Sequence, residues 1–143
     1  MSKPDARAGY KIGLILWVSL LSSTIAYPVI SFIVKAPEGF EPAEGFEMII
    51  GVMSMIAVSS AVMSFVIKHI IFGKQLKAGQ ATRQTWQTGH LVAWAMSESV
   101  AIFGLVLYML SYQQMYMVPF VLGSWLLFAL HFPKKSTYES VRP

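Results

Sequence analysis

Four long apolar runs, separated by short polar segments, dominate the 143-residue sequence and limit the folds open to it. An α-helix rises about 1.5 Å per residue, so about 20 apolar residues cross the hydrocarbon core of a bilayer. Only 13% of the residues are charged, whereas soluble domains carry about 25%. The sequence therefore predicts an all-α, polytopic membrane protein, with residues 1–143 forming a single integral membrane domain of four transmembrane helices. The expected spans are about 12–34, 48–67, 91–112 and 115–132.

Positive charge is distributed unevenly among the segments that join these runs. Every Lys and Arg except Lys35 lies in the N-terminal segment, in the loop after the second run or in the C-terminal segment. The loop after the first run, residues 35–47, is acidic and holds four glutamates. Basic segments of membrane proteins stay in the cytoplasm. We therefore expect both termini and the basic loop 73–89 to be cytoplasmic and the acidic loop to be external, in a bacterial cytoplasmic membrane.

Several classes of function lack their sequence signals. The chain has no cysteine, which excludes disulfides, thiolate metal ligands and covalent c-type haem. We find no phosphate-binding loop, nucleophile elbow or paired catalytic carboxylates, so we expect neither an enzyme nor a cofactor. Basic segments here indicate topology rather than nucleic acid, and the expected partners are the lipid bilayer and other membrane subunits, with copies of the chain among the candidates. His69, His90 and His131 lie near the cytoplasmic boundaries and are weak candidates for a metal or haem b site.

Glu98 is an acidic residue within an apolar run, in the segment AMSESVAIFGLVLY at positions 95–108. An acidic side chain at the centre of a membrane helix costs roughly 2.5–3.5 kcal/mol on insertion scales. Glu98 lies about 10 Å into its run at 1.5 Å per residue. We therefore expect Glu98 to face protein or water and to be able to hold a proton.

The second apolar run carries small residues at helical spacing, which favour the close approach of another membrane helix. If the second and third runs form a hairpin that turns near Gly79, residues equidistant from the turn lie at the same depth. Glu98 is then level with Ser60, which is the expected ion-binding partner on the second run. The residues expected to support helix packing are Ser54, Ala57, Ala61, Ser64 and Gly104.

The segment TGHLVAWAMSESVAIFGLVLYML resembles the carboxylate-bearing helix of the rotary ATP synthase c-subunit proteolipid. The motifs SES at 97–99 and IFGLV at 102–106 match that helix in order and spacing. The resemblance covers the hairpin at residues 48–112 and leaves the flanking runs uncovered. It implies that Glu98 is an ion-carrying carboxylate with the hydroxyl of Ser99 beside it. It also implies a proton rather than sodium, because the second run has no glutamine.

Two functions remain open from the sequence. The first is a small, four-span, proteolipid-like subunit of a membrane complex in which Glu98 binds or exchanges a proton. The alternative is a non-catalytic anchoring or scaffolding subunit in which Glu98 is a neutral, hydrogen-bonded packing group. A membrane anchor that binds haem b or a metal is a minor alternative.

Overall fold

Apolar helices form the bundle, as the apolar runs predicted. The computed structural model describes the backbone of residues 3–42 and 44–142 and, within these ranges, the side chains from Ala8 onward. The side chains of Lys3 and Arg7, which contribute to the predicted charge pattern, lie outside the described residues. In the described part every regular element is a helix, which confirms the all-α prediction.

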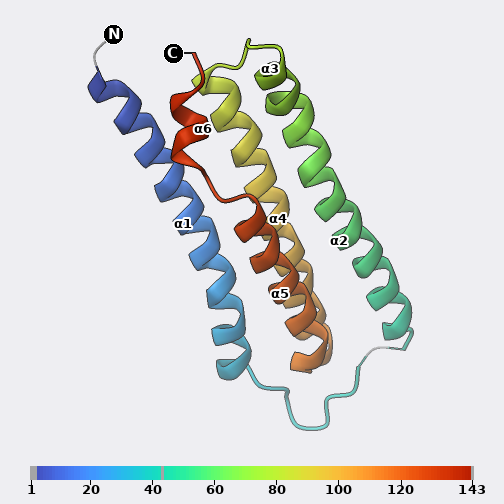
Figure 1. Cartoon of the computed structure of the whole chain (residues 1–143). Coiled ribbons are helices and arrows are strands. Elements are labelled where there is room, and N and C mark those ends of the chain that lie inside the picture. The colour runs from blue at the N-terminus through green and yellow to red at the C-terminus, as the bar shows by residue number, and fades with distance from the viewer. Residues whose placement is uncertain (1–2, 43, 143) are drawn as a thin grey trace.

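The long helices run alternately up and down one bundle (Figure 1). The helices, in chain order, are α1 (Lys3–Ile33), α2 (Phe46–Lys68), the π-helical turn η1 (His69–Gly73), α3 (Lys74–Lys77), α4 (Arg83–Ser111), α5 (Gln114–Leu130) and α6 (Lys135–Glu139). Helices α1 and α2 are joined by the acidic loop at one end, and a short turn at the other end leads into α4. Helix α5 then returns along α4.

The turn between α3 and α4 is set by local chemistry. Gly79 adopts a left-handed conformation with φ of 67°, which glycine reaches without steric cost, so the predicted turn point is confirmed. Thr82 then begins α4 with a capping box, in which the Thr82 and Thr85 side chains each accept from the other residue's backbone N–H. The basic segment 73–89 is mostly helical on either side of this turn, because α3 continues to Lys77 and α4 starts at Arg83.

Three helical stretches are long and apolar enough to cross a membrane, namely Ala8–Ile33, Phe46–Lys77 and Arg83–Ser111. Many of their outward apolar side chains stay exposed, as at Phe32 (69%) and Met55 (73%). Apolar surface of this extent is unusual on soluble proteins and suits contact with lipid, which indicates an integral membrane protein. The fourth predicted span, 115–132, corresponds to α5, whose 17 residues extend only about 26 Å at 1.5 Å each.

Helix α4 is the centre of the bundle and packs against α1, α2 and α5. Its inward residues Ala93, Ala101 and Leu107 are completely buried. The C-terminal segment closes one end: α6 packs near α1, and the Arg142 backbone pairs with Ala81 and Arg83 beside the start of α4. The start of α1, the α3–α4 turn and the C-terminal segment therefore share one end of the bundle (Figure 1).

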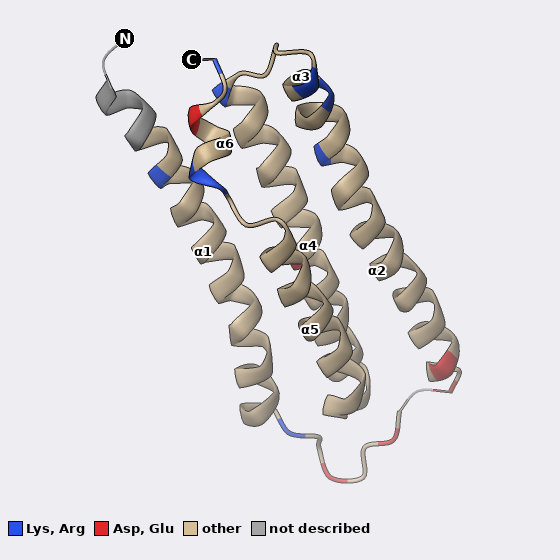
Figure 2. Cartoon of the chain, viewed as in Figure 1, with Lys and Arg blue, Asp and Glu red and all other residues tan. Residues whose placement is uncertain are grey.

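Charged residues are segregated along the bundle (Figure 2). Lys and Arg gather at the end formed by α3, α6 and the start of α4, which we call the basic end. The glutamates of the acidic loop lie at the opposite end. Each end also holds a charge of the other sign, Glu139 in α6 and Lys35 after α1. Glu98 lies within α4, between the two ends.

Candidate functional site

Glu98 lies near the middle of α4 and is half-buried. Its Oε1 atom accepts hydrogen bonds from the Ser23 hydroxyl and, at 3.3 Å, from the Tyr27 hydroxyl. Ser23 and Tyr27 are four residues apart on α1 and therefore share one face of that helix. The other carboxyl oxygen, Oε2, has no hydrogen-bond partner among the described residues, and these residues do not bury it completely.

The Ser23 hydroxyl connects Glu98 to the backbone of α1. Its Oγ lies 2.6 Å from the Leu20 carbonyl oxygen and also within hydrogen-bond reach of Glu98. A serine hydroxyl has one proton to donate and lone pairs that accept. A charged Glu98 can take the Ser23 proton, whereas a protonated Glu98 can donate to Ser23, which then donates to Leu20. Ser23 and Glu98 are therefore hydrogen-bonded in either protonation state, whereas the bond from Ser23 to the Leu20 carbonyl forms only when Glu98 is protonated.

Ser60, the predicted partner of Glu98, lies on α2, whereas the Glu98 side chain is on the side of α4 that faces α1. The described residues show no hydrogen bond between the two side chains, and both observed donors to Glu98 come from α1. Val100 packs with Ala57 of α2. Glu98 precedes Val100 by two residues, which is about 200° around a helix of 3.6 residues per turn. A residue that faces α2 at position 100 thus requires position 98 to face away from α2.

Ser99, the other predicted ion-binding residue, also has a different role. Its hydroxyl donates to the Met96 carbonyl of the same helix at 2.8 Å. A serine within a helix often satisfies its hydroxyl in this way. Of the predicted ion-binding residues, only Glu98 therefore belongs to the hydrogen-bonded site, and Ser23 and Tyr27 complete it.

Two hydrogen bonds, one buried and one partly buried, hold the three helices around this site. Trp125 of α5 donates its indole N–H to the Thr24 hydroxyl at 2.9 Å, and Ser124 donates to the Ser97 carbonyl at 2.7 Å. Thr24, Ser97 and Ser124 are fully buried. Since buried polar groups are costly when unpaired, these bonds fix how α1, α4 and α5 meet beside Glu98.

Gly104 lies at a close approach of α4 and α5. A Cβ atom at this position would stand 2.7 Å from the Phe120 Cβ and 2.9 Å from the Met117 carbonyl oxygen. Only glycine fits these distances without movement of α5, and small residues of this kind let membrane helices approach closely. The predicted packing role of Gly104 agrees with this geometry.

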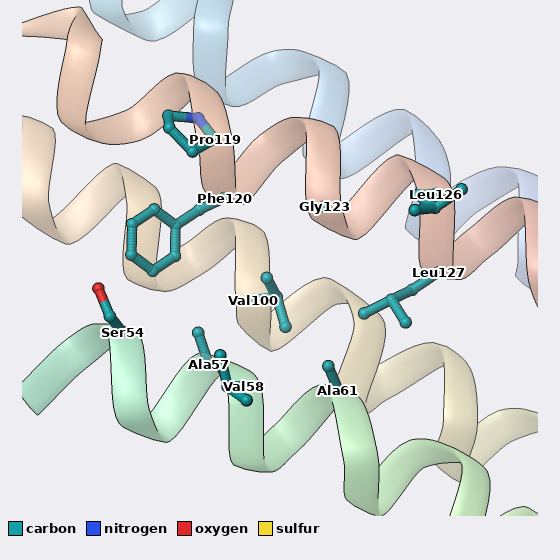
Figure 3. Close-up of a pocket in the computed structure, with 10 residues that line it drawn as sticks. All are labelled: Ser54, Ala57, Val58, Ala61, Val100, Pro119, Phe120, Gly123, Leu126 and Leu127. Atoms are coloured by element: carbon teal, nitrogen blue, oxygen red, sulfur yellow. The ribbon is translucent and has the colours of Figure 1, made fainter.

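The small residues of α2 leave an apolar groove beside α4 (Figure 3). Ser54, Ala57 and Ala61 form one wall, Phe120 and other α5 residues form the opposite wall, and Val100 of α4 lies between them. The hollow measures about 400 Å³. The predicted packing face of α2 thus packs on α4 at Ala57 but does not fill the space toward α5.

Ser64, also predicted to support packing, belongs to a chain of hydrogen bonds near the basic end. Its hydroxyl donates to the Ala61 carbonyl at 2.7 Å and lies 2.9 Å from His131 Nε2. Lys68 Nζ lies 3.4 Å from the other ring nitrogen, Nδ1. An ammonium group can only donate, so Nδ1 accepts from Lys68 and Nε2–H donates to Ser64.

The three histidines do not converge on one point. His131 is bonded to Ser64 and Lys68, His90 Nδ1 bonds to the Trp86 carbonyl at 2.8 Å, and His69 is exposed on η1. Within the described ranges no group of three or more potential metal ligands is close enough to hold an ion. The three predicted metal candidates therefore do not form a ligand set among the described residues, although His69 and His131 line the same hollow.

Comparison with models of known protein families found no match, and no curated protein or solved structure was found to be similar to the chain.

Proposed function

We propose that this protein is a small subunit of a membrane complex that binds and releases a proton at Glu98. Ser23 and Tyr27 of α1 hold the carboxyl group in this proposal. The observation that carries it is the hydrogen-bond arrangement around Ser23, which can be satisfied with Glu98 either charged or protonated. A site that changes protonation state needs partners that serve both states, because an unpaired buried polar group is costly.

Access to the carboxyl group also favours proton exchange. Glu98 is half-buried, and its Oε2 atom is neither hydrogen-bonded to the described residues nor fully enclosed by them. A group used only for packing would be expected to have both oxygens paired inside the protein. An open oxygen leaves room for a water molecule or a partner subunit to deliver the proton.

We further propose that α5 is a fourth crossing and that the basic end faces the cytoplasm of a bacterium. The alternation of α1, α2, α4 and α5 along the bundle supports an even number of crossings. The gathering of Lys and Arg at one end supports the orientation. A helix of about 26 Å can span when flanking residues reach the interface or the bilayer thins locally.

The alternative is a scaffolding subunit in which Glu98 only fastens α1 to α4. The hydrogen bonds from Ser23 and Tyr27 favour this alternative too, because they join two helices. In that case Glu98 would keep one protonation state at all accessible pH values. Measurement of proton exchange therefore separates the two functions.

A hydrophobic carbodiimide tests the proposal in the intact protein, since it modifies protonated carboxyl groups within membranes. We expect modification at Glu98, detected by mass spectrometry, to decline as the pH is raised, and to be absent from Glu98→Gln. Exposed Glu41 serves as an internal control for reaction outside the membrane. Modification of Glu98 that is absent, or constant over the whole pH range in which the bundle stays folded, would contradict the proposal.

A further inference from the structure

A second hollow lies one helical turn beyond the apolar groove, along the same pair of helices. The apolar groove ends at Ala61 on α2 and Leu127 on α5. The second hollow begins at Phe65 and Leu130 and is also lined by Lys68, His69 and His131, with a volume of about 390 Å³. The seam between α2 and α5 therefore has an apolar section near the middle of the bundle and a basic section near its basic end.

Lys68 gives the basic section its charge. Its ammonium group contacts His131. Among the described residues no carboxylate forms an ion pair with Lys68; the salt bridge found there joins Lys135 to Glu139. Lys134 is close enough for its positive charge to oppose that of Lys68. A half-buried ammonium group without a counter-ion is costly, and an anion placed beside it would be stabilised.

The length of the seam matches one lipid molecule. From Ser54 to Lys68 the α2 axis extends about 21 Å at 1.5 Å per residue. One leaflet of a bilayer has about 15 Å of hydrocarbon, half of the whole core. An acyl chain in the apolar groove and a headgroup beside Lys68 would thus fit within the seam.

We propose that the seam between α2 and α5 binds one anionic phospholipid, with its phosphate at Lys68 and one acyl chain in the groove over Val100. The combination of charge and shape argues for this occupant: a zwitterionic lipid would offer less attraction to Lys68, and free phosphate would leave the groove empty. Small residues at Ala57, Ala61 and Gly123 make the space for the chain. The proposal is independent of the role of Glu98, which faces the other side of α4.

Native mass spectrometry of the purified full chain tests this proposal. The chain is titrated with dioleoyl phosphatidylglycerol and, separately, with dioleoyl phosphatidylcholine, which has the same acyl chains. We expect one phosphatidylglycerol to bind, about tenfold more tightly than phosphatidylcholine, as for one charge-assisted contact. Equal affinity for the two lipids would overturn the proposal.

Variants separate the headgroup from the acyl chain. Lys68→Gln should lose the preference for phosphatidylglycerol, whereas Lys68→Arg and the exposed control Lys77→Gln should keep it. Gly123→Leu should weaken both lipids, because its side chain enters the groove. A Cβ at Gly123 would meet nothing closer than Val100 Cγ1 at 4.0 Å, so this variant is expected to fold.

Exposed Ala129→Leu, on the same helix but outside the groove, is the control for Gly123→Leu. Circular dichroism and gel filtration establish that each variant is folded. If folded Lys68→Gln binds phosphatidylglycerol as tightly as Lys77→Gln does, the phosphate is not at Lys68. If folded Gly123→Leu binds as Ala129→Leu does, the chain is not in the groove. Either result would overturn the proposal.

Discussion

The carboxyl group of Glu98 is held by hydroxyl groups of a neighbouring helix rather than by a basic side chain. Ser23 and Tyr27 can donate to a carboxylate, and Ser23 can also accept from a protonated carboxyl. A buried Lys or Arg would instead favour the charged state strongly. Hydroxyl partners therefore suit a group that changes protonation state within the membrane.

Removal of either hydroxyl should make Glu98 hold its proton more readily. Ser23→Ala and Tyr27→Phe each remove a donor to Glu98. A hydrogen bond to the charged carboxylate is stronger than one to the neutral carboxyl, so each loss disfavours the charged form by about 1 kcal/mol. At a pH where the carboxyl is mostly charged, we expect carbodiimide modification of Glu98 to increase about fivefold in each variant. Ser22→Ala is the matched control, because the Ser22 side chain is exposed. Equal modification in Ser22→Ala and Ser23→Ala would exclude Ser23 as a partner.

At this scale the sequence predicted the residue but not its neighbours. The cost of a carboxylate in an apolar run singled out Glu98, and the hairpin argument estimated its depth. Depth alone does not determine the face of a helix, so Ser60 was expected where Ser23 and Tyr27 lie. The hydroxyls at positions 23 and 27 share a helical face, and that spacing was the available signal.

Close contact along the α4–α5 hairpin depends on one small residue. At Gly104 an added Cβ would approach the Phe120 Cβ and the Met117 carbonyl to distances of 2.7 and 2.9 Å. At Gly123, on α5, the nearest atom would be 4.0 Å away. The two glycines thus differ in what surrounds them, although both lie in apolar helices.

Gly104→Val should destabilise the bundle by roughly 1–3 kcal/mol, since overpacking forces helices apart. Gly123→Val, the matched control, should cost much less because its site has space. Thermal unfolding in detergent, followed by circular dichroism, measures the difference. Equal midpoints for the two variants would show that α4 and α5 are not packed as described.

The contribution of the capping box to the stability of α4 can be tested separately. Thr82→Ala removes the hydroxyl that accepts from the Thr85 backbone, which should cost about 1 kcal/mol. Thr88→Ala, later in the helix and away from the cap, is the control. The same unfolding measurement applies, and a loss no greater than that of Thr88→Ala would contradict the assigned cap.

The existence of the helices was predictable from the apolar runs, but some of their ends were not. Helix α2 continues through η1 and α3 to Lys77, about ten residues past the end of the second predicted span. Polar and basic residues can continue a helix beyond the hydrocarbon core of the membrane. The hydropathy pattern locates only the part of the helix within that core. Gly79 ends that continuation, and its role as a turn was predicted.

Over the whole molecule, the segments that the charge pattern groups together in the sequence also lie together in the structure. The basic segments predicted to share a side of the membrane do share one end of the bundle, and the acidic loop lies at the other (Figure 2). Sequence alone could predict this because the alternation of four runs determines which connections share an end. The fourth apolar run, 115–132, is the shortest of the four, and α5 is correspondingly short.

Labelling of introduced cysteines tests the proposed orientation, and the chain offers a background free of native cysteine. We expect a membrane-impermeant maleimide to label Glu41→Cys in intact spheroplasts and to label Ser136→Cys only after lysis. Both native residues are exposed, at opposite ends of the bundle. Labelling of Ser136→Cys in intact spheroplasts would contradict a cytoplasmic basic end.

Proton exchange at Glu98 is tested most directly by infrared spectroscopy of the protein in lipid vesicles as the pH is changed. A protonated carboxyl gives a C=O stretching band that vanishes when the proton leaves. Subtraction of the Glu98→Gln spectra removes the bands of the other acidic residues. We predict a band assigned to Glu98 that disappears reversibly as the pH rises and shifts in Tyr27→Phe. A Glu98 signal that is the same at every pH at which the protein is folded would contradict proton exchange and favour the scaffolding role.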